Sequence, residues 1–115
     1  MKRIAYICGP ISAANAYEQE MNVRRAEAVY VELCKAGIPA ICVHPGSRFT
    51  GGLLTHEQWM DLCLPLLELC TDLVLVEGWE KSKGSRMELA HAGKIRMYVW
   101  LCVEDFLAHA RKGAA

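Results

Sequence analysis

Four short apolar runs divide the sequence, and each is bounded by glycine, proline or charged residues. They cover Arg3 to Cys8, Ile38 to Val43, Asp72 to Glu77 and Ile95 to Leu101. Short runs of this kind, rich in β-branched and aromatic side chains and closed by such breakers, are typical of buried strands. The pattern therefore predicts four strands along the chain.

Segments with helical spacing separate these runs. Asn15 is a suitable N-cap with Glu18 three residues later, and apolar residues then recur among charges until Gly37, which predicts a helix from Tyr17 to Ala36. Thr55 and Gln58 match a capping box and predict a helix from His56 to about Cys70, which Pro65 should kink or divide. Two further helices are predicted over 84–93, opening at Gly84 or Ser85, and over 104–112; the segments 44–54 and 78–83 are predicted loops.

Strands that alternate with helices and are apolar throughout indicate a parallel sheet covered on both faces. Right-handed crossovers then favour a small doubly wound, flavodoxin-like α/β sheet of about four to five strands, with residues 1–115 as a single domain. Ligands bind such sheets beyond the carboxyl ends of the strands. Candidate chemistry is therefore expected where the segments 9–15, 44–54 and 78–84 meet.

Composition narrows the function classes. The 13 basic and 13 acidic side chains give a net charge of zero, which argues against a nucleic-acid polymer as partner. The apolar runs are too short for a membrane span or a secretory signal, so a cytoplasmic protein is expected. Hydrophobic residues make up 53% of the chain, above the usual value of about 45–50%, and the excess predicts a homodimer or larger homo-oligomer.

The cysteines and histidines indicate no metal site. The six cysteines include no C-x-x-C pair, and the four histidines offer none of the paired spacing that a zinc site needs. Without a secretion signal, buried free thiols are the better interpretation than disulfides.

The segment after the third predicted strand is the most informative. Glycines and serines there lead into a helix, whose free N–H groups and dipole favour an anion, so Ser82 and Gly84 are candidates for holding a phosphate or a sugar hydroxyl. Glu88 lies close to the same edge. Two interpretations of Glu88 stay open here: Ser85 and Glu88 also match a capping box, in which the glutamate is only structural.

Two motifs in this order carry a family resemblance. The first is Tyr6-Ile7-Cys8-Gly9-Pro10-Ile11; the second begins at Glu77-Gly78-Trp79 and continues as Ser82-x-Gly84-x-x-x-Glu88-x-x-x-Ala92. Together they resemble the nucleoside 2-deoxyribosyltransferase superfamily, which includes 2'-deoxynucleoside 5'-monophosphate N-glycosidases. The resemblance extends from the first predicted strand to the fourth.

The resemblance implies a role for each matching residue. Glu88 takes the place of the family's nucleophile, Tyr6 that of the tyrosine that touches it, and Ser82 that of the serine that contacts a 5'-phosphate. The assisting acid is expected on the helix before the third strand, where Asp61 is the nearest candidate although strict spacing falls on Leu64. The remaining substrate-binding positions are Gly9, Pro10, Ile11, Ser12, Trp79 and Gly84.

These residue types suit cleavage or transfer of an N-glycosidic bond. A carboxylate that attacks C1' forms a covalent glycosyl-enzyme, and a second acid protonates the departing base. The expected substrate is a 2'-deoxynucleoside or its 5'-monophosphate, a small molecule handled without a cofactor. Trp79 and Trp59 are candidates for stacking on the base, or else for packing.

Two other functions stay open. The same fold can be a nucleotide-binding module without turnover, because a fold does not fix a function. Cys42 and Arg48 form a C-x5-R sequence after a strand, as in cysteine phosphatases, but the glycines that follow Arg48 argue against the helix that such a loop opens. A dinucleotide-binding fold is excluded, because no G-x-G-x-x-G follows the first strand.

Overall fold

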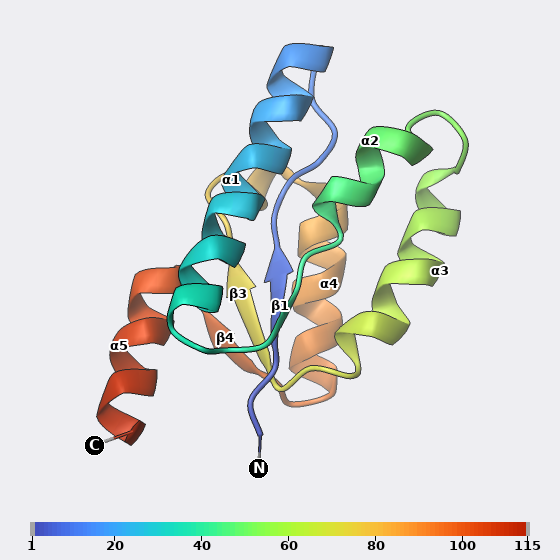
Figure 1. Ribbon diagram of the computed structural model, residues 1–115. Coiled ribbons are helices and arrows are strands. Elements are labelled where there is room, and N and C mark those ends of the chain that lie inside the picture. Colours follow the sequence, from blue (N-terminus) through green and yellow to red (C-terminus); the bar gives the residue numbers. More distant parts are fainter. Residues whose placement is uncertain (1, 115) are drawn as a thin grey trace.

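A parallel sheet forms the centre of the protein in a computed structural model that describes residues 2–114 (Figure 1). Its four strands lie in the order β2-β1-β3-β4, and every neighbouring pair is parallel. Their bounds are β1 Ala5–Cys8, β2 Ala40–Ile41, β3 Asp72–Leu75 and β4 Tyr98–Trp100. The predicted parallel α/β architecture is confirmed.

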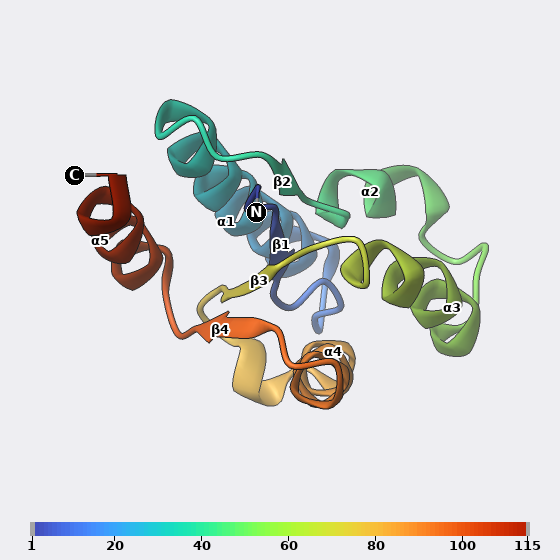
Figure 2. The same cartoon turned by 90° about the horizontal axis from the view of Figure 1, so that it is seen from below.

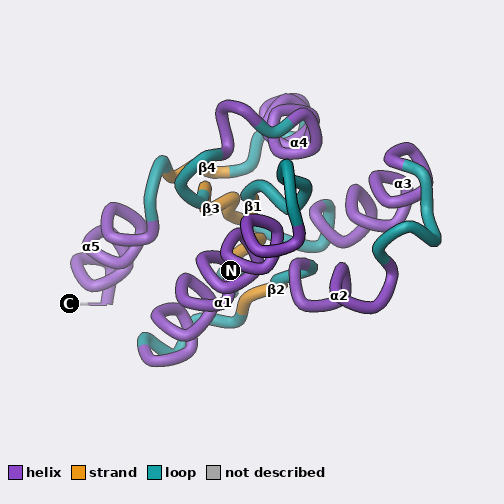
Figure 3. Tube along the Cα trace, turned by 90° about the horizontal axis from the view of Figure 1, so that it is seen from above, coloured by secondary structure: helices purple, strands orange, loops and turns teal. Residues whose placement is uncertain are grey.

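Helices cover both faces of this sheet (Figures 2 and 3). Helix α1 (Ala16–Lys35) and helix α5 (Val103–Ala114) pack on one face. Helix α4 (Lys83–Lys94) packs on the other, with α3 (His56–Leu67) beside it. Three short elements complete the chain: η1 His44–Gly46, α2 Ser47–Thr50 and η2 Trp79–Lys81.

Alternation along β1 decides which side chains face the site. Ala5 and Ile7 join the apolar cluster beneath α1 and α5, whereas Tyr6 and Cys8 join the cluster beneath α3 and α4. All four side chains are fully buried. Tyr6 and Cys8 therefore face the helix that carries Glu88.

The predicted helix starts are confirmed at α1 and α3. The Asn15 side chain accepts a hydrogen bond from the backbone N–H of Glu18, and Thr55 and Gln58 form the capping box in full. Helix α4 starts earlier than predicted, because Ser82 rather than Gly84 or Ser85 is its N-cap.

Three other elements differ from the predictions. Strand β2 has only two residues, because as an edge strand it pairs with β1 alone, at Ala40 and Ile41. The segment 44–54 is not a plain loop: η1 begins at His44 with Pro45 in its first turn, the Ser47 hydroxyl donates to the His44 carbonyl oxygen at 2.7 Å, and α2 follows. The glycines after Arg48 therefore end a one-turn helix rather than prevent one.

Helix α3 ends at Leu67, two residues after Pro65, rather than near Cys70.

The prediction of buried free thiols is confirmed in part. All six cysteines, which lie within the described residues, are free, and Cys8, Cys63 and Cys70 are buried as predicted, whereas Cys34 is exposed. Large apolar side chains are exposed along α3 and at β4, for example Leu62 and Tyr98. The homo-oligomer stays a prediction.

Within residues 2–114, the helices are too short or too polar to cross a membrane.

The Asp72 side chain, at the start of β3, joins Arg3, which precedes β1, to Trp100 of β4. Its fully buried carboxylate accepts hydrogen bonds from the Arg3 guanidinium, from Thr71 Oγ1 at 2.6 Å and from Trp100 Nε1 at 2.9 Å. The Arg3 guanidinium also lies over the Tyr98 ring, 5.2 Å from its centroid. Burial raises the pKa of Asp72, but these hydrogen bonds and the Arg3 charge outweigh it and hold the pKa below its ordinary value.

Replacing Asp72 by Asn should lower the free energy of unfolding by about 2–3 kcal/mol at pH 7, because the buried donors lose a charged acceptor. The folded pKa lies below the unfolded value of about 3.9, so the native carboxylate stabilises the fold above that pH and less as the pH falls. The difference between wild type and Asp72→Asn should therefore shrink below about pH 4. Urea unfolding at several pH values measures it. A loss below about 0.5 kcal/mol, the size expected for the exposed control Asp61→Asn, would contradict this role.

Candidate functional site

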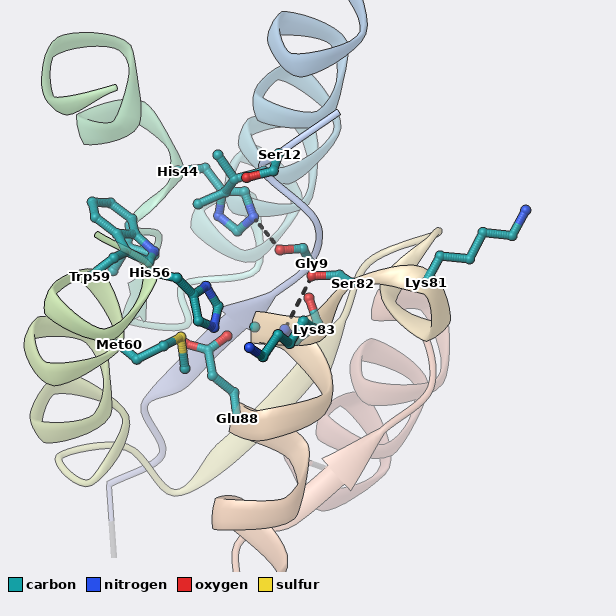
Figure 4. A pocket seen from close by; sticks show the side chains of 14 residues that line it. Gly9, Ser12, His44, His56, Trp59, Met60, Lys81, Ser82, Lys83 and Glu88 are labelled. Carbon is teal, nitrogen blue, oxygen red and sulfur yellow. Dashed lines mark hydrogen bonds between the residues drawn. The ribbon is translucent and has the colours of Figure 1, made fainter. Parts of the chain in front are cut away.

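A pocket opens at the carboxyl edge of the sheet, between the start of α4 and the first turns of α3 (Figure 4). The three segments predicted to meet there do so: Gly9, Ile11 and Ser12 follow β1, His44 follows β2, and residues 81–84 span the end of η2 and the start of α4. Helix α3 supplies His56, Trp59 and Met60, and α4 supplies Ser85 and Glu88. The expected location of the site is thus occupied by a pocket with polar and aromatic walls.

Glu88 is the buried carboxylate of this pocket. Its side chain is only 6% exposed, and the Tyr6 hydroxyl donates a hydrogen bond to its Oε2. Because Ser82 accepts from the Ser85 backbone N–H and caps α4, Ser85 lies inside the helix and cannot be the cap of a capping box with Glu88. Of the two interpretations of Glu88, the structural cap is wrong, and the side chain faces the pocket.

Burial raises the pKa of Glu88 to about 6, while the Tyr6 hydroxyl and the Cys8 thiol act in the opposite direction. The carboxylate is therefore ionised at neutral pH and is more basic than an ordinary glutamate. A perturbed carboxyl group inside a pocket is a common property of catalytic sites. The arrangement suits a nucleophile or a general base.

The neighbours of Glu88 stay protonated. Burial and the charge of Glu88 raise the pKa of Tyr6 far above its ordinary value, so its hydroxyl remains a donor. The same two causes raise the pKa of Cys8 strongly, and its thiol lies 3.5 Å from the Ser85 carbonyl oxygen. Tyr6 therefore orients the carboxylate, and Cys8 fills the space beside it without becoming a thiolate.

Close packing positions the first loop. A Cβ at Gly9 would lie 2.7 Å from Val76 Cβ, so no side chain fits there. The Gly9 carbonyl oxygen accepts a hydrogen bond from His44 Nε2 at 3.0 Å. Ile11 and Ser12 line the pocket, whereas Pro10 lies outside its wall and packs against Gly78. Gly78 itself has a φ of +93°, which a glycine adopts readily.

His44 was not among the sequence candidates. Its ring is 1% exposed, and burial lowers its pKa, so it stays neutral. With Nε2 donating to Gly9 and Nδ1 lying 3.8 Å from Cys42 Sγ, both ring nitrogens have neighbours. Its place directly after β2, at the carboxyl edge, is the signal that could have identified it.

The start of α4 forms the anion-favouring wall. Ser82 and Gly84 both line the pocket as predicted, and free backbone N–H groups of the first turn face this end of the helix. Lys83 lines the same wall, while Figure 4 shows Lys81 extending away from Glu88. Backbone N–H groups and the Lys83 side chain at this end of the pocket favour a phosphate, and the N–H groups and the Ser82 hydroxyl suit a sugar hydroxyl.

Besides Pro10, two predicted site residues are not brought to the pocket. Trp79 packs against the apolar cluster beneath α4 and lines a separate hollow, which Leu101 also lines. Asp61 is exposed on α3, outside the pocket, and Leu64 packs into the same apolar cluster as Trp79. Trp59, and not Trp79, is the tryptophan of the pocket.

Cys42 and Arg48 do not form a phosphate-binding loop. The Arg48 guanidinium donates to both carboxylates of Glu20 and Glu27, at 2.8–3.0 Å, and so joins α2 to α1. Burial raises the pKa of Cys42 to about 11, which leaves no thiolate for attack at neutral pH. The two side chains line different hollows.

Comparison with known proteins gives a family but no activity. Residues 3–101 match the model of a family described as a domain of unknown function, DUF4406, and this range includes every strand and the whole pocket. No curated protein matches the chain. Since the match covers most of its length, the chain belongs to the DUF4406 family of domains of unknown function.

Proposed function

We propose that this protein cleaves or transfers the N-glycosidic bond of a 2'-deoxynucleoside or its 5'-monophosphate, with Glu88 as the nucleophile. The observation that carries the proposal is the buried Glu88 carboxylate, held by the Tyr6 hydroxyl inside a pocket at the carboxyl edge of the sheet. The motifs around both residues resemble the nucleoside 2-deoxyribosyltransferase superfamily in order and spacing.

Glu88 has the properties that this chemistry needs. One carboxylate oxygen is fixed by Tyr6, which leaves the other free to attack C1' of a bound sugar. The C1'–N bond breaks, its electron pair stays on the base, and a glycosyl-Glu88 ester forms. Water, or the nitrogen of a second base, then attacks C1' and releases Glu88, which gives hydrolysis or transfer respectively.

The pocket walls provide a place for each part of such a substrate. Ser12, Ser82 and the first turn of α4 offer hydroxyls and backbone N–H groups to the sugar and to a 5'-phosphate, with Lys83 as a nearby cation. The Trp59 ring on α3 offers a flat surface on which a base can stack. A substrate held between α3 and α4 therefore presents its sugar to Glu88.

Replacing Glu88 by Gln should abolish base release from deoxynucleosides and their 5'-monophosphates, because the neutral amide cannot form the ester. The expected loss in kcat is on the order of a thousandfold or more. Glu80→Gln is the matched control, since Glu80 is exposed on η2 and does not line the pocket. Chromatography of free base, with and without an acceptor base, measures the rates. Retained activity in Glu88→Gln would overturn the nucleophile, and no release by wild type would favour a binding module.

The acid limb of the pH–rate profile should report Glu88. Its pKa of about 6 predicts that kcat/KM falls tenfold per pH unit below about pH 6, as the carboxylate is protonated. In Tyr6→Phe the hydrogen bond that lowers this pKa is lost, so the limb should move to higher pH and the rate at neutral pH should fall roughly 10- to 100-fold. An unshifted limb in Tyr6→Phe would show that another group controls the profile.

The ionised Glu88 should also cost stability. Its folded pKa lies above the ordinary value of 4.5, so the folded state binds protons more tightly and the free energy of unfolding falls as the pH rises through 4.5 to 6. The free energy of unfolding of Glu88→Gln should therefore be about 1–2 kcal/mol higher than that of wild type at pH 8, and this difference should vanish near pH 4. Urea unfolding of both proteins at the two pH values measures it. A destabilised Glu88→Gln at pH 8 would indicate a structural role instead.

A further inference from the structure

A second titratable side chain enters the pocket opposite Glu88. His56 is the first residue of α3, it is half-buried, and Figure 4 shows its ring directed into the space that Glu88 faces from α4. Its Nε2 lies 3.5 Å from Met87 Sδ. A thioether sulfur is a weak acceptor, so this nitrogen can exchange its contact for a stronger one on a bound molecule.

The other polar groups of the pocket are less suited to proton transfer. Within the part of the chain that the structure describes, the titratable side chains on its walls are Glu88, His44, His56, Lys81 and Lys83. His44 is sealed in the wall by Gly9 and Cys42, and Lys81 extends away. A lysine ammonium ordinarily keeps its proton near neutral pH, whereas an imidazole gains and loses one there. Histidine is accordingly the commonest general acid and base.

The position of His56 on α3 matches the place of a departing base. His56, Trp59 and Met60 have the i, i+3, i+4 spacing of one helical face, and all three line the pocket. The ring also lies against Gly84 at the start of α4: a Cβ on Gly84 would be 3.5 Å from His56 Cε1. His56 thus stands between the aromatic wall for the base and the wall that holds the sugar.

We infer that His56 is the general acid that protonates the leaving base, in the role that Asp61 was expected to fill. The inference rests on the proposed N-glycosidic reaction. As Glu88 attacks C1' and the C1'–N bond breaks, the imidazolium N–H of His56 gives its proton to the base, which leaves neutral. The neutral imidazole then accepts a proton from the water, or from the acceptor base, that attacks C1' and displaces Glu88. One turnover restores both side chains.

Leaving-group dependence tests this role. Base release is measured for 2'-deoxyguanosine, its 5'-monophosphate and the 7-methyl derivatives of both, whose positively charged base departs without being protonated. His56→Asn should lower kcat/KM about 100- to 10,000-fold on the ordinary substrates but less than about tenfold on the methylated ones. Glu88→Gln should lose both. Retained cleavage of the methylated substrate also shows that His56→Asn is folded.

His109→Asn is the matched control, because His109 is exposed on α5 and packs on Trp100, away from the pocket. Equal losses of His56→Asn on both substrate classes in a folded protein, or no loss on either, would overturn the inference while leaving the N-glycosidic reaction intact. Wild type that cleaves only the methylated substrates would overturn it as well. Wild type that cleaves neither class would instead remove the proposed function on which it rests.

Discussion

The hydrogen bond between Tyr6 and Glu88 is the interaction on which the candidate site depends. A carboxylate buried among apolar side chains is costly unless a donor faces it, and Tyr6 is the residue of β1 that alternation turns toward α4. The helix must also start at the right residue. Because Ser82 caps α4, Ser85, Glu88 and Ala92 form its buried face, and the carboxylate reaches the sheet at the tyrosine.

The remainder of the site is built on rigid elements that support this pair. Val76 leaves no room for a side chain at Gly9, and the His44 ring holds the Gly9 carbonyl oxygen by a hydrogen bond. Arg48 joins α2 to α1 and so holds the segment that follows His44. Positions set by packing and hydrogen bonds, rather than by loop flexibility, are what a preorganised nucleophile requires.

Local sequence signals predicted most of the fold, since the strands and the caps of α1 and α3 are determined largely by neighbouring residues. The strands, the Asn15 cap and the Thr55 capping box needed no tertiary information. Glu88 stayed ambiguous because Ser82 and Ser85 both suit an N-cap, and only packing selects the first. The segment 44–54 depended on Arg48 binding Glu20 and Glu27, more than twenty residues earlier, and His56 depended on how α3 lies against α4. Such contacts over long sequence separations leave no local pattern.

A covalent trap tests the central claim most directly. A 2'-deoxy-2'-fluoroarabinosyl nucleoside carries an electron-withdrawing fluorine that slows hydrolysis of a glycosyl-enzyme, so the intermediate accumulates. The account predicts that base is released in a burst, that the protein gains the mass of one fluorinated sugar, and that peptide mapping places it on Glu88. Base release with no adduct, or an adduct on another residue, would contradict it.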